Sequence, residues 1–505
     1  MLSALRTHKL IIPLVLIFII MLIQISWTGD DAFITMRTVD NFVHGFGLRW
    51  NVDERVQVFT HPLWMFLLVA VYSLVHDPYL ALLGLSITVS TITFFLFLIL
   101  VPRSNFSLVL AGMILLFSKA FIDYSTSGLE NPATHLLLLG FCVAALTAQP
   151  IDEKRIFLLS LLAGLLMLNR LDAVLFVLPM LAVVLWQNRS RRTLALFIAG
   201  MSPFLLWEAF SLIYYGFLLP NTYYAKLNSG VPAGALMTQG LQYFLNSLSL
   251  NPITLVIIFI ALGLTFSGKA DSERWLALGV CLYLGYILFI GGDFMSGRYF
   301  TAPLVVSVIL LIRRVENITT LQKWTWVVFV FVLGWALAPV KSYDDIVTTV
   351  DSTAGISDEM FWHYPYTNLQ YLLHETSHPW ESTGKMLSEN GTLVSVEGGI
   401  GMLGFTAGPK VHIIDYLALA DPLLAHLPIA NPRKWRIGHF ERALPEGYRE
   451  TIESGENRIR DPALAEYYRQ LRLITSGPIW SAERWHAIWM MNTGQYNDLL
   501  AEYWQ

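Results

Sequence analysis

The chain has little charge for its length. Of its 505 residues, 14% are charged and 55% are hydrophobic, whereas a soluble domain carries about 25% charged residues. This deficit excludes an ordinary soluble protein and indicates a membrane protein with many spanning segments. The formal net charge of −4 also gives no reason to expect a nucleic-acid partner.

Cysteine is scarce too. The chain has two cysteines, Cys142 and Cys281, and each lies inside an apolar run. We therefore predict free thiols and no disulfide, even where part of the chain faces an oxidising compartment.

A secretory cleavage signal is missing from the N-terminus. Arg6, His8 and Lys9 precede an apolar run over residues 10–27. A cleaved signal peptide ends in a small-x-small pattern, but residues 24–28 read Gln-Ile-Ser-Trp-Thr. The run is predicted to be an uncleaved first membrane helix with its basic end in the cytoplasm.

About eleven apolar runs are candidate membrane spans. Each is close to the ~17–25 residues that a spanning helix needs, or can extend into its flanks. A twelfth run, 62–76, has only about fifteen residues, begins at Pro62 and is followed by Asp77 and Pro78. The eleven candidates are 10–27, 79–101, 106–122, 132–148, 156–169, 173–187, 194–215, 252–267, 275–291, 301–312 and 324–340.

The basic residues of the loops decide whether 62–76 crosses the membrane. If it does not cross, all the basic loops lie in the cytoplasm with the N-terminus, as the positive-inside rule requires. If it crosses, the same loops lie outside. We therefore predict that 62–76 is a juxtamembrane helix at the outer face. The loop residues are Arg103, Lys154, Arg155, Arg189, Arg191, Arg192, Lys269, Arg274, Arg313, Arg314 and Lys323.

This topology places the polar motifs of the membrane half on the outer, non-cytoplasmic face. The topology rests on Lys and Arg alone. The acidic motifs on the opposite face therefore support it independently. The motifs are residues 30–31, 60–62, 127–130, 169–172, 220–226 and 291–298.

The composition changes after about residue 340. Charged residues, His, Gly and Pro become frequent, and no later run is long enough to span a bilayer. We predict a transmembrane domain over 1–340, with 28–78 as its first outer loop, and a soluble domain over 341–505 on the same outer side.

The soluble domain is predicted to be α/β or α+β. Residues 392–397 and 411–415 alternate as strands do, and 461–473 and 481–491 are helical in pattern. Residues 398–404 are rich in glycine, but their spacing matches neither a P-loop nor a dinucleotide fingerprint. We therefore predict close backbone packing there and no nucleotide.

Two adjacent carboxylates, Asp30 and Asp31, follow the first apolar run. Charged groups at the mouth of a membrane helix are costly unless they have a function. One can act as a general base while the other coordinates a divalent cation or orients a neighbour. The alternative is that Asp30 caps a helix that begins near Ala32.

Further acidic groups stand at helix ends on the same face, and each also has a structural interpretation. Glu130 precedes a proline that fits a first helical turn. Arg170 can pair with Asp172, and Asp293 can pair with Arg298. The cations of this face, which suit a phosphate leaving group, are Arg37, Arg170, Lys226 and Arg298.

Several of these motifs resemble blocks of a known family, the terminal arabinofuranosyltransferases of mycobacteria (AftB-type) and their relatives across bacteria. The blocks occur in order over nearly the whole chain. They are DDAFI at 30–34, GFGLRWN at 45–51, THPLW at 60–64, SGLE at 127–130, PNTYYAK at 220–226, GDFMSGR at 292–298, and GHF at 438–440 with Pro445 and Tyr448 behind it.

The resemblance implies a glycosyltransferase of the GT-C superfold. Such enzymes are polytopic α-helical proteins of the bacterial cytoplasmic (inner) membrane that work on its periplasmic face. They use a polyprenyl-phosphate sugar as donor and carry an acidic motif in the first outer loop, beside juxtamembrane helices. In the AftB-type family, the donor is decaprenyl-phosphoryl arabinofuranose and the acceptor is a cell-wall arabinan.

Two positions depart from the family pattern. Residues 169–173 read Asn-Arg-Leu-Asp-Ala where the family often has an Arg-Pro-Glu-Gly-like block, and Ser296 stands where proline is common. The sugar and the acceptor therefore stay open. The acceptor can be a lipopolysaccharide, another glycan chain or a surface protein such as a pilin.

We therefore predict inverting transfer of a sugar, with arabinofuranose as a candidate, from a polyprenyl monophosphate to an acceptor hydroxyl. Asp30 or Asp31 deprotonates the acceptor, with Asp30 favoured, and the C-terminal domain binds the acceptor. A divalent cation (Mg²⁺, Mn²⁺ or Ca²⁺) is predicted on Asp31, Glu130 and Asp293. Arg37, Arg170, Lys226 and Arg298 are predicted to bind the donor phosphate. The other site candidates are His61, Glu130, Asp172, Asn221, Tyr223, Asp293 and His439.

The sequence also bears on three other functions. A flippase or transporter of lipid-linked sugars predicts polar residues near the bilayer midplane and internal repeats, whereas here the polar motifs gather at one face and no repeat is visible. A non-catalytic envelope scaffold gives no reason for Asp30-Asp31. A ligase or polymerase with a diphosphate donor would be separated only by substrate assays.

Overall fold

The computed structural model describes residues 9–147, 152–227, 229–268, 270–316, 318–336, 354–369 and 377–503. The chain forms two compact units, each built from segments that are distant in the sequence. Unit 1 contains Met1–Gly29, Tyr79–Phe204 and Pro232–Thr376. Unit 2 contains Asp30–Pro78, Leu205–Val231 and Ser377–Gln505. The predicted domain boundary at residue 340 lies outside the described residues.

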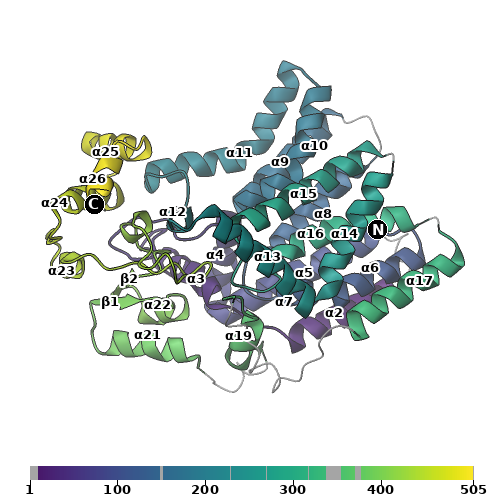
Figure 1. The fold of residues 1–505 in the computed structure, drawn as a ribbon, viewed down its shortest axis with the longest axis horizontal. Helices are drawn as coiled ribbons and strands as arrows, with labels where there is room; N and C mark the ends of the chain where they lie inside the picture. The colour runs from purple at the N-terminus through teal and green to yellow at the C-terminus, as the bar shows by residue number, and fades with distance from the viewer. Residues whose placement is uncertain are drawn as a thin grey trace. The chain divides into compact units, whose positions relative to one another are not determined.

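Unit 1 is a bundle of mostly apolar helices (Figure 1). Each of the eleven predicted spans coincides with a helix, and the last part of α11 continues into unit 2. The helices are α2 (Ile11–Gln24), α5 (Pro78–Leu100), α6 (Asn105–Phe117), α7 (Lys119–Asp123), α8 (Asn131–Leu146), α9 (Glu153–Asn169), α10 (Val174–Gln187), α11 (Arg191–Tyr214), α13 (Ala233–Leu250), α14 (Pro252–Ser267), α15 (Asp271–Ile290), α16 (Thr301–Val315), α17 (Thr320–Phe331) and α19 (Glu359–Thr367).

By length and composition, three described helices can cross a membrane: α5, α11 and α15. The pair α13 and α14, bent by 110°, would be a fourth if it forms one broken span. The shorter apolar helices include α2, α4 (Pro62–Val75), α6 and α8. The molecule is thus a membrane protein with several apolar helices, and the total of eleven crossings stays a prediction.

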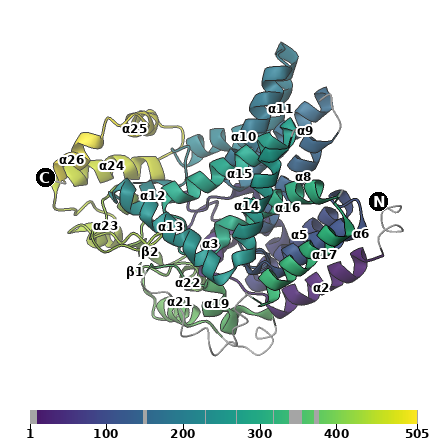
Figure 2. The ribbon, with the colours of Figure 1, turned by 45° about the vertical axis from the view of Figure 1, so that its right-hand side comes forward.

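Close helix packing organises unit 1. Helix α10 packs against α15, α14 against α16, and α6 against both α2 and α17 (Figures 1 and 2). A Cβ atom on Gly279 of α15 would lie 2.2 Å from the backbone oxygen of Phe176 in α10. Small residues permit such close approach between membrane helices. Cys142 is buried and Cys281 is partly buried, and both are free, as predicted.

Unit 2 holds the only regular strands among the described residues. Strands β1 (Val394–Glu397) and β2 (His412–Asp415) pair in parallel, with Val394 opposite His412 and Glu397 opposite Asp415. Both lie at the predicted positions. Helix α22, between them in the chain, packs against α21 (Figure 2). The helices are α3 (Asp30–Val43), α4, α12 (Asn221–Leu227), α21 (Pro379–Glu389), α22 (Met402–Ala407), α23 (Tyr448–Ser454), α24 (Pro462–Ser476), α25 (Ala482–Asn492) and α26 (Asn497–Tyr503).

The run 62–76 forms helix α4. Pro62 stands in its first turn, where a missing N–H costs nothing, and His76 ends the helix in the left-handed region with φ 55°. Helix α4 packs against α3, and both belong to unit 2. Its place at the membrane surface stays a prediction.

Candidate functional site

The acidic pair forms the first turn of α3, and the first carboxylate binds a distant segment. Asp30 Oδ2 accepts a hydrogen bond of 2.9 Å from the Gly401 amide, and Asp30 Oδ1 accepts one of 2.7 Å from the Met402 amide. The donors stand 371 and 372 residues later in the chain. Asp30 and Asp31 are both partly exposed.

The glycine-rich segment fits closely against α3. A Cβ atom on Gly401 would lie 1.9 Å from the backbone oxygen of Asp30, a distance that no folded chain tolerates. The prediction of close backbone packing in residues 398–404 is therefore confirmed. Only glycine allows the Gly401 amide to reach the Asp30 carboxylate.

Arg37, about two turns after Asp30 in α3, is 2% exposed. Its guanidinium donates to the backbone oxygens of Trp50 (2.9 Å), Gly404 (2.8 Å) and Val411 (2.7 Å), and lies 4.2 Å from the Trp50 ring centre. Burial lowers the pKa of Arg37 to about 9. These contacts make it a structural anchor, and its predicted phosphate contact stays a prediction.

His61 and Asn221 are also buried in unit 2. His61 Nε2 lies 2.8 Å from the Thr35 hydroxyl of α3, so it fixes the entry to α4. Asn221 donates from its amide to the backbone oxygens of Ala418, Leu419 and Asp421 at 3.0–3.1 Å. Both side chains therefore join segments of the fold.

Tyr223 and Lys226, by contrast, are exposed on helix α12. Exposure leaves both side chains able to meet a ligand. His439 is partly buried, with Nδ1 3.4 Å from the backbone oxygen of Ile437. The roles of Tyr223 and His439 stay predictions.

In unit 1, Glu130 is the centre of a buried ion network. The residue is 1% exposed. Its carboxylate forms ion pairs with Arg170 Nη1 at 2.8 Å and with Arg298 Nη2 at 3.2 Å. Arg170 also binds both oxygens of Asp172, at 3.0 and 2.6 Å. Arg298 Nη1 lies 3.6 Å from Asp293 Oδ2. The two pairings weighed as structural interpretations therefore both occur.

Two polar atoms of this network lack a hydrogen bond. Asp293 Oδ2 and Arg298 Nε are buried and have no hydrogen-bond partner in the described structure. Both cations nevertheless face carboxylates, so their charge is largely neutralised within unit 1. Binding of a phosphate by Arg170 or Arg298 stays a prediction.

The predicted divalent cation is not matched by a cluster of ligands. Among the described residues, no three His, Cys, Asp or Glu side chains gather closely enough to hold a metal ion. Glu130 and Asp293 meet Arg298 instead. The predicted ligands belong to different units, Asp31 to unit 2 and Glu130 and Asp293 to unit 1, and the cation stays a prediction.

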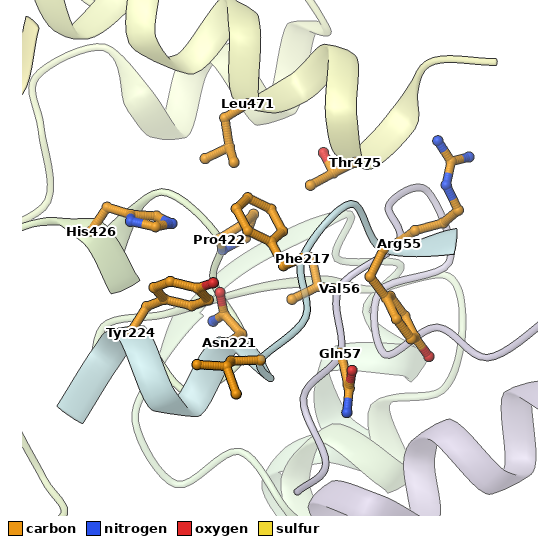
Figure 3. Close-up of a pocket in the computed structure, with 12 residues that line it drawn as sticks. Arg55, Val56, Gln57, Phe217, Asn221, Tyr224, Pro422, His426, Leu471 and Thr475 are labelled. Atoms are coloured by element: carbon orange, nitrogen blue, oxygen red, sulfur yellow. The ribbon is translucent and has the colours of Figure 1, made fainter. Parts of the chain in front are cut away.

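Unit 2 also contains an open pocket (Figure 3), with an empty volume of about 310 Å³ that includes space open to solvent. Tyr224 and His426 line one part of it, with ring centres 5.0 Å apart. Two of its polar groups serve the fold: Arg55 donates to the backbone oxygen of Tyr214, and Asn221 to three other carbonyls.

Sequence reasoning missed a buried acidic cluster around His412 in unit 2. Burial, with the nearby charges of Asp53 and Asp421, raises the pKa of Glu54 to about 8. Burial opposes protonation of His412, but its hydrogen bond to Asp53 at 3.0 Å and the negative charges of Glu54, Asp53 and Asp421 together outweigh this and raise its pKa. Burial raises the pKa of Asp421 to about 6. No local sequence pattern predicts this cluster, because its members come from segments that are far apart in the sequence.

These features define a class: a mostly helical membrane protein with several apolar helices and acidic motifs at helix ends, consistent with a GT-C-like glycosyltransferase.

Two relatives make the class more definite. The terminal β-(1→2)-arabinofuranosyltransferase of Mycobacterium tuberculosis is 26% identical, over 84% of this chain and 82% of that protein. The protein of the same name from Corynebacterium glutamicum is 25% identical, over 88% of this chain and 80% of its own. The resemblance predicted from the motifs is confirmed. No family model and no solved structure matches the chain.

Proposed function

We propose that this chain is a membrane glycosyltransferase. It transfers a sugar, with arabinofuranose as the first candidate, from a polyprenyl-phosphate donor to a hydroxyl of a cell-envelope glycan or surface protein on the periplasmic face. The observation that carries the proposal is the similarity to two arabinofuranosyltransferases over 84% and 88% of the chain. The acidic pair at the start of α3 supplies the carboxylate that the reaction needs.

The proposed reaction is a single displacement at the anomeric carbon. The acceptor oxygen forms a bond to that carbon as the bond to the phosphate oxygen breaks. The acceptor proton passes to a carboxylate of the pair, acting as general base. The polyprenyl phosphate leaves with the electron pair of the broken bond, and the configuration at the anomeric carbon inverts.

A departing phosphate is stabilised by cations that are in place before the bond breaks. Lys226, exposed on α12, is our first candidate for this role because a solvent-facing ammonium can reach a phosphate as a point charge. Arg170, Arg298 and the buried Arg37 remain candidates.

The test uses the purified full-length protein with a synthetic polyprenyl-phosphoryl arabinofuranose and an oligosaccharide acceptor. Loss of a general base costs about 10²–10⁴-fold in rate, so Asp30→Ala and Asp31→Ala should both lose activity while folding normally. The matched control is Asp271→Ala, whose side chain is 83% exposed at the start of α15.

Full activity in both variants of the pair would overturn the proposal. The anomeric configuration of the product, read by NMR, tests inversion separately. Movement of the donor across a vesicle membrane without formation of a glycosidic bond would identify a flippase instead.

A further inference from the structure

Three polar side chains around the pocket of unit 2 keep hydrogen-bonding groups that the fold does not use. His426 is 9% exposed, and neither of its ring nitrogens has a hydrogen-bond partner among the described residues. The same holds for the hydroxyl group of Tyr224. Asn221 is 8% exposed and donates from its amide nitrogen, but its amide oxygen accepts no hydrogen bond from the described residues. Buried polar groups nearly always have partners, so these three groups indicate a ligand in the pocket.

The walls that carry these groups are held in place by the fold. The short helix η4 (Leu424–His426) packs against α12. Arg442, which is 4% exposed, donates to the backbone oxygen of Leu427 at 2.7 Å and to that of Ala225 in α12 at 2.5 Å. It therefore ties the end of η4 to α12. A pocket that is already ordered spends less free energy on ordering its side chains when a ligand binds.

Aromatic rings supply the apolar part of the pocket. The ring centre of Tyr224 lies 5.0 Å from that of His426 and 5.5 Å from that of Phe217, and the ring centres of Phe217 and His426 are 6.1 Å apart (Figure 3). Aromatic side chains combine a large apolar face with polar groups at the edge. Such a surface suits a ligand that has both C–H groups and hydroxyl groups.

The pocket offers little to an ionic ligand. Arg55 lines it, but its guanidinium donates to three backbone oxygens elsewhere in unit 2 and extends away from His426 and Tyr224 (Figure 3). Burial lowers the pKa of His426 to about 4 and, with Tyr223 nearby, raises the pKa of Tyr224 to about 12. Both side chains are therefore neutral at pH 7, whereas phosphates and carboxylates are bound best by charged donors.

The hydrogen-bonding groups of the pocket match hydroxyl groups. A neutral imidazole has one donor and one acceptor nitrogen, a tyrosine hydroxyl both donates and accepts, and an amide oxygen accepts. Each hydroxyl group of a sugar also donates and accepts. A hydrocarbon chain would instead leave all three protein groups without partners, at a cost in free energy. The chemistry of the pocket therefore favours a neutral sugar.

We propose that this pocket is a sugar-binding subsite, in which the aromatic rings contact the C–H face of one sugar residue while His426, Tyr224 and Asn221 bind its hydroxyl groups. The residue belongs to the neutral glycan that accepts the transferred sugar, so the proposal rests on the proposed function. Because the pocket is open to solvent, the rest of the glycan can continue outward. The subsite raises the affinity for the acceptor without taking part in the chemical step.

Binding without turnover is the first test. The purified full-length protein is titrated, in the absence of donor, with a neutral arabinofuranosyl oligosaccharide and with the same oligosaccharide carrying carboxymethyl groups. The neutral form should bind more tightly. His426→Phe and Tyr224→Phe keep the rings and remove the polar atoms, so each should raise the Kd of the neutral form about 2- to 10-fold, the effect of losing one hydrogen bond. The double variant should raise it further.

The matched controls are His486→Phe and Tyr496→Phe. They make the same two changes at side chains of unit 2 that do not line the pocket, one of them exposed on α25 and the other partly exposed, and they should leave the Kd unchanged. Thermal unfolding of every variant is followed. If the double variant does not fold, Tyr224→Phe, at a partly exposed ring, decides the question.

Steady-state kinetics distinguish the acceptor from the donor, whose sugar is neutral as well. The pocket variants should raise the acceptor KM by about the same factor as the Kd, and should leave kcat at saturating acceptor and the donor KM within about twofold of wild type. A rise confined to the donor KM would place the donor sugar in the pocket and overturn the proposal.

Wild-type protein that does not bind the neutral oligosaccharide would overturn the proposal, and so would a double variant that binds it as tightly as the wild type does. Because binding is measured without turnover, the proposed function is judged separately. A protein that transfers no sugar but loses oligosaccharide binding in the double variant would keep the sugar-binding subsite and remove the proposed function.

Discussion

At Arg37, one guanidinium group is held by three backbone oxygens and an indole ring. In the sequence it is a cation of the outer loop and a candidate for phosphate binding. In the structure it is buried, and its planar set of donors meets carbonyls from α3's neighbouring segments. Lysine cannot replace such a fork, because it carries a single point charge.

Replacement of Arg37 should therefore affect stability before it affects substrate binding. Arg37→Ala leaves buried carbonyls without a partner and should lower the free energy of unfolding by roughly 3 kcal/mol, and Arg37→Lys should not restore it. Chemical or thermal unfolding of the purified protein measures the change, with the exposed Arg449→Ala as control. A stable Arg37→Ala protein with a raised donor KM would show a role in phosphate binding instead.

Glu130 should be equally important for stability. Removing one partner of a buried ion pair costs about 3–5 kcal/mol because the other charge is left uncompensated, and Glu130→Gln leaves both Arg170 and Arg298 in that state. The control is Glu153→Gln, at an exposed residue that pairs with Arg192. Such surface pairs contribute about 0–1 kcal/mol to the free energy of unfolding. An unfolding midpoint unchanged by Glu130→Gln would contradict the network.

The residues that sequence reasoning placed correctly are close neighbours in the chain. Arg170 and Asp172 stand two positions apart, and Asp293 and Arg298 five, so local geometry alone brings them together. Asp30 and Gly401 are joined by a contact across 371 residues. No pattern within either segment specifies that contact, which depends on how the whole of unit 2 folds.

Among the elements, hydrophobic runs and strand alternation were the strong signals. The helix at each predicted span and strands β1 and β2 follow from them. Helix α13 was not predicted, because Gln239, Asn246 and Ser247 interrupt the apolar pattern of its sequence. The short helices α12 and α22 were also missed, since six or seven residues carry too little periodicity to identify.

The cluster of Asp53, Glu54, His412 and Asp421 should make the stability of unit 2 depend on pH. The folded-state pKa of Glu54 (about 8), of Asp421 (about 6) and of His412 all lie above their ordinary values. Between pH 5 and 8 these three groups bind more protons in the folded state than in the unfolded state, so they make the free energy of unfolding fall as pH rises. The lowered pKa of Asp53 acts only below about pH 4.

This dependence can be measured by thermal unfolding at pH 5, 6.5 and 8. Glu54→Gln removes one of the titrating groups and should flatten the decline. Glu456→Gln, whose partner is solvent-exposed and whose own side chain is 76% exposed, should leave it unchanged. Stability that rises over this range in the unmodified protein would contradict the argument.

At the scale of the whole molecule, the membrane topology is open to direct test. Ser190 lies in a predicted cytoplasmic loop and Ser454 in the predicted periplasmic part, and both are exposed. With Cys142 and Cys281 replaced, a membrane-impermeant maleimide should label Ser454→Cys in intact spheroplasts. It should label Ser190→Cys only after the membrane is opened. The reverse pattern would place the soluble segments in the cytoplasm.

The bonds between Asp30 and the amides of Gly401 and Met402 also have a consequence for synthesis of the chain. Asp30 leaves the ribosome first, and its partners follow 371 and 372 residues later. At about 5–20 residues per second, a nascent chain carries its acidic pair for roughly 20 to 75 s before those amides exist. A chain that stalls or is cut short in this interval never acquires the bonds that hold the first turn of α3, so the arrangement described here requires translation to continue past Met402.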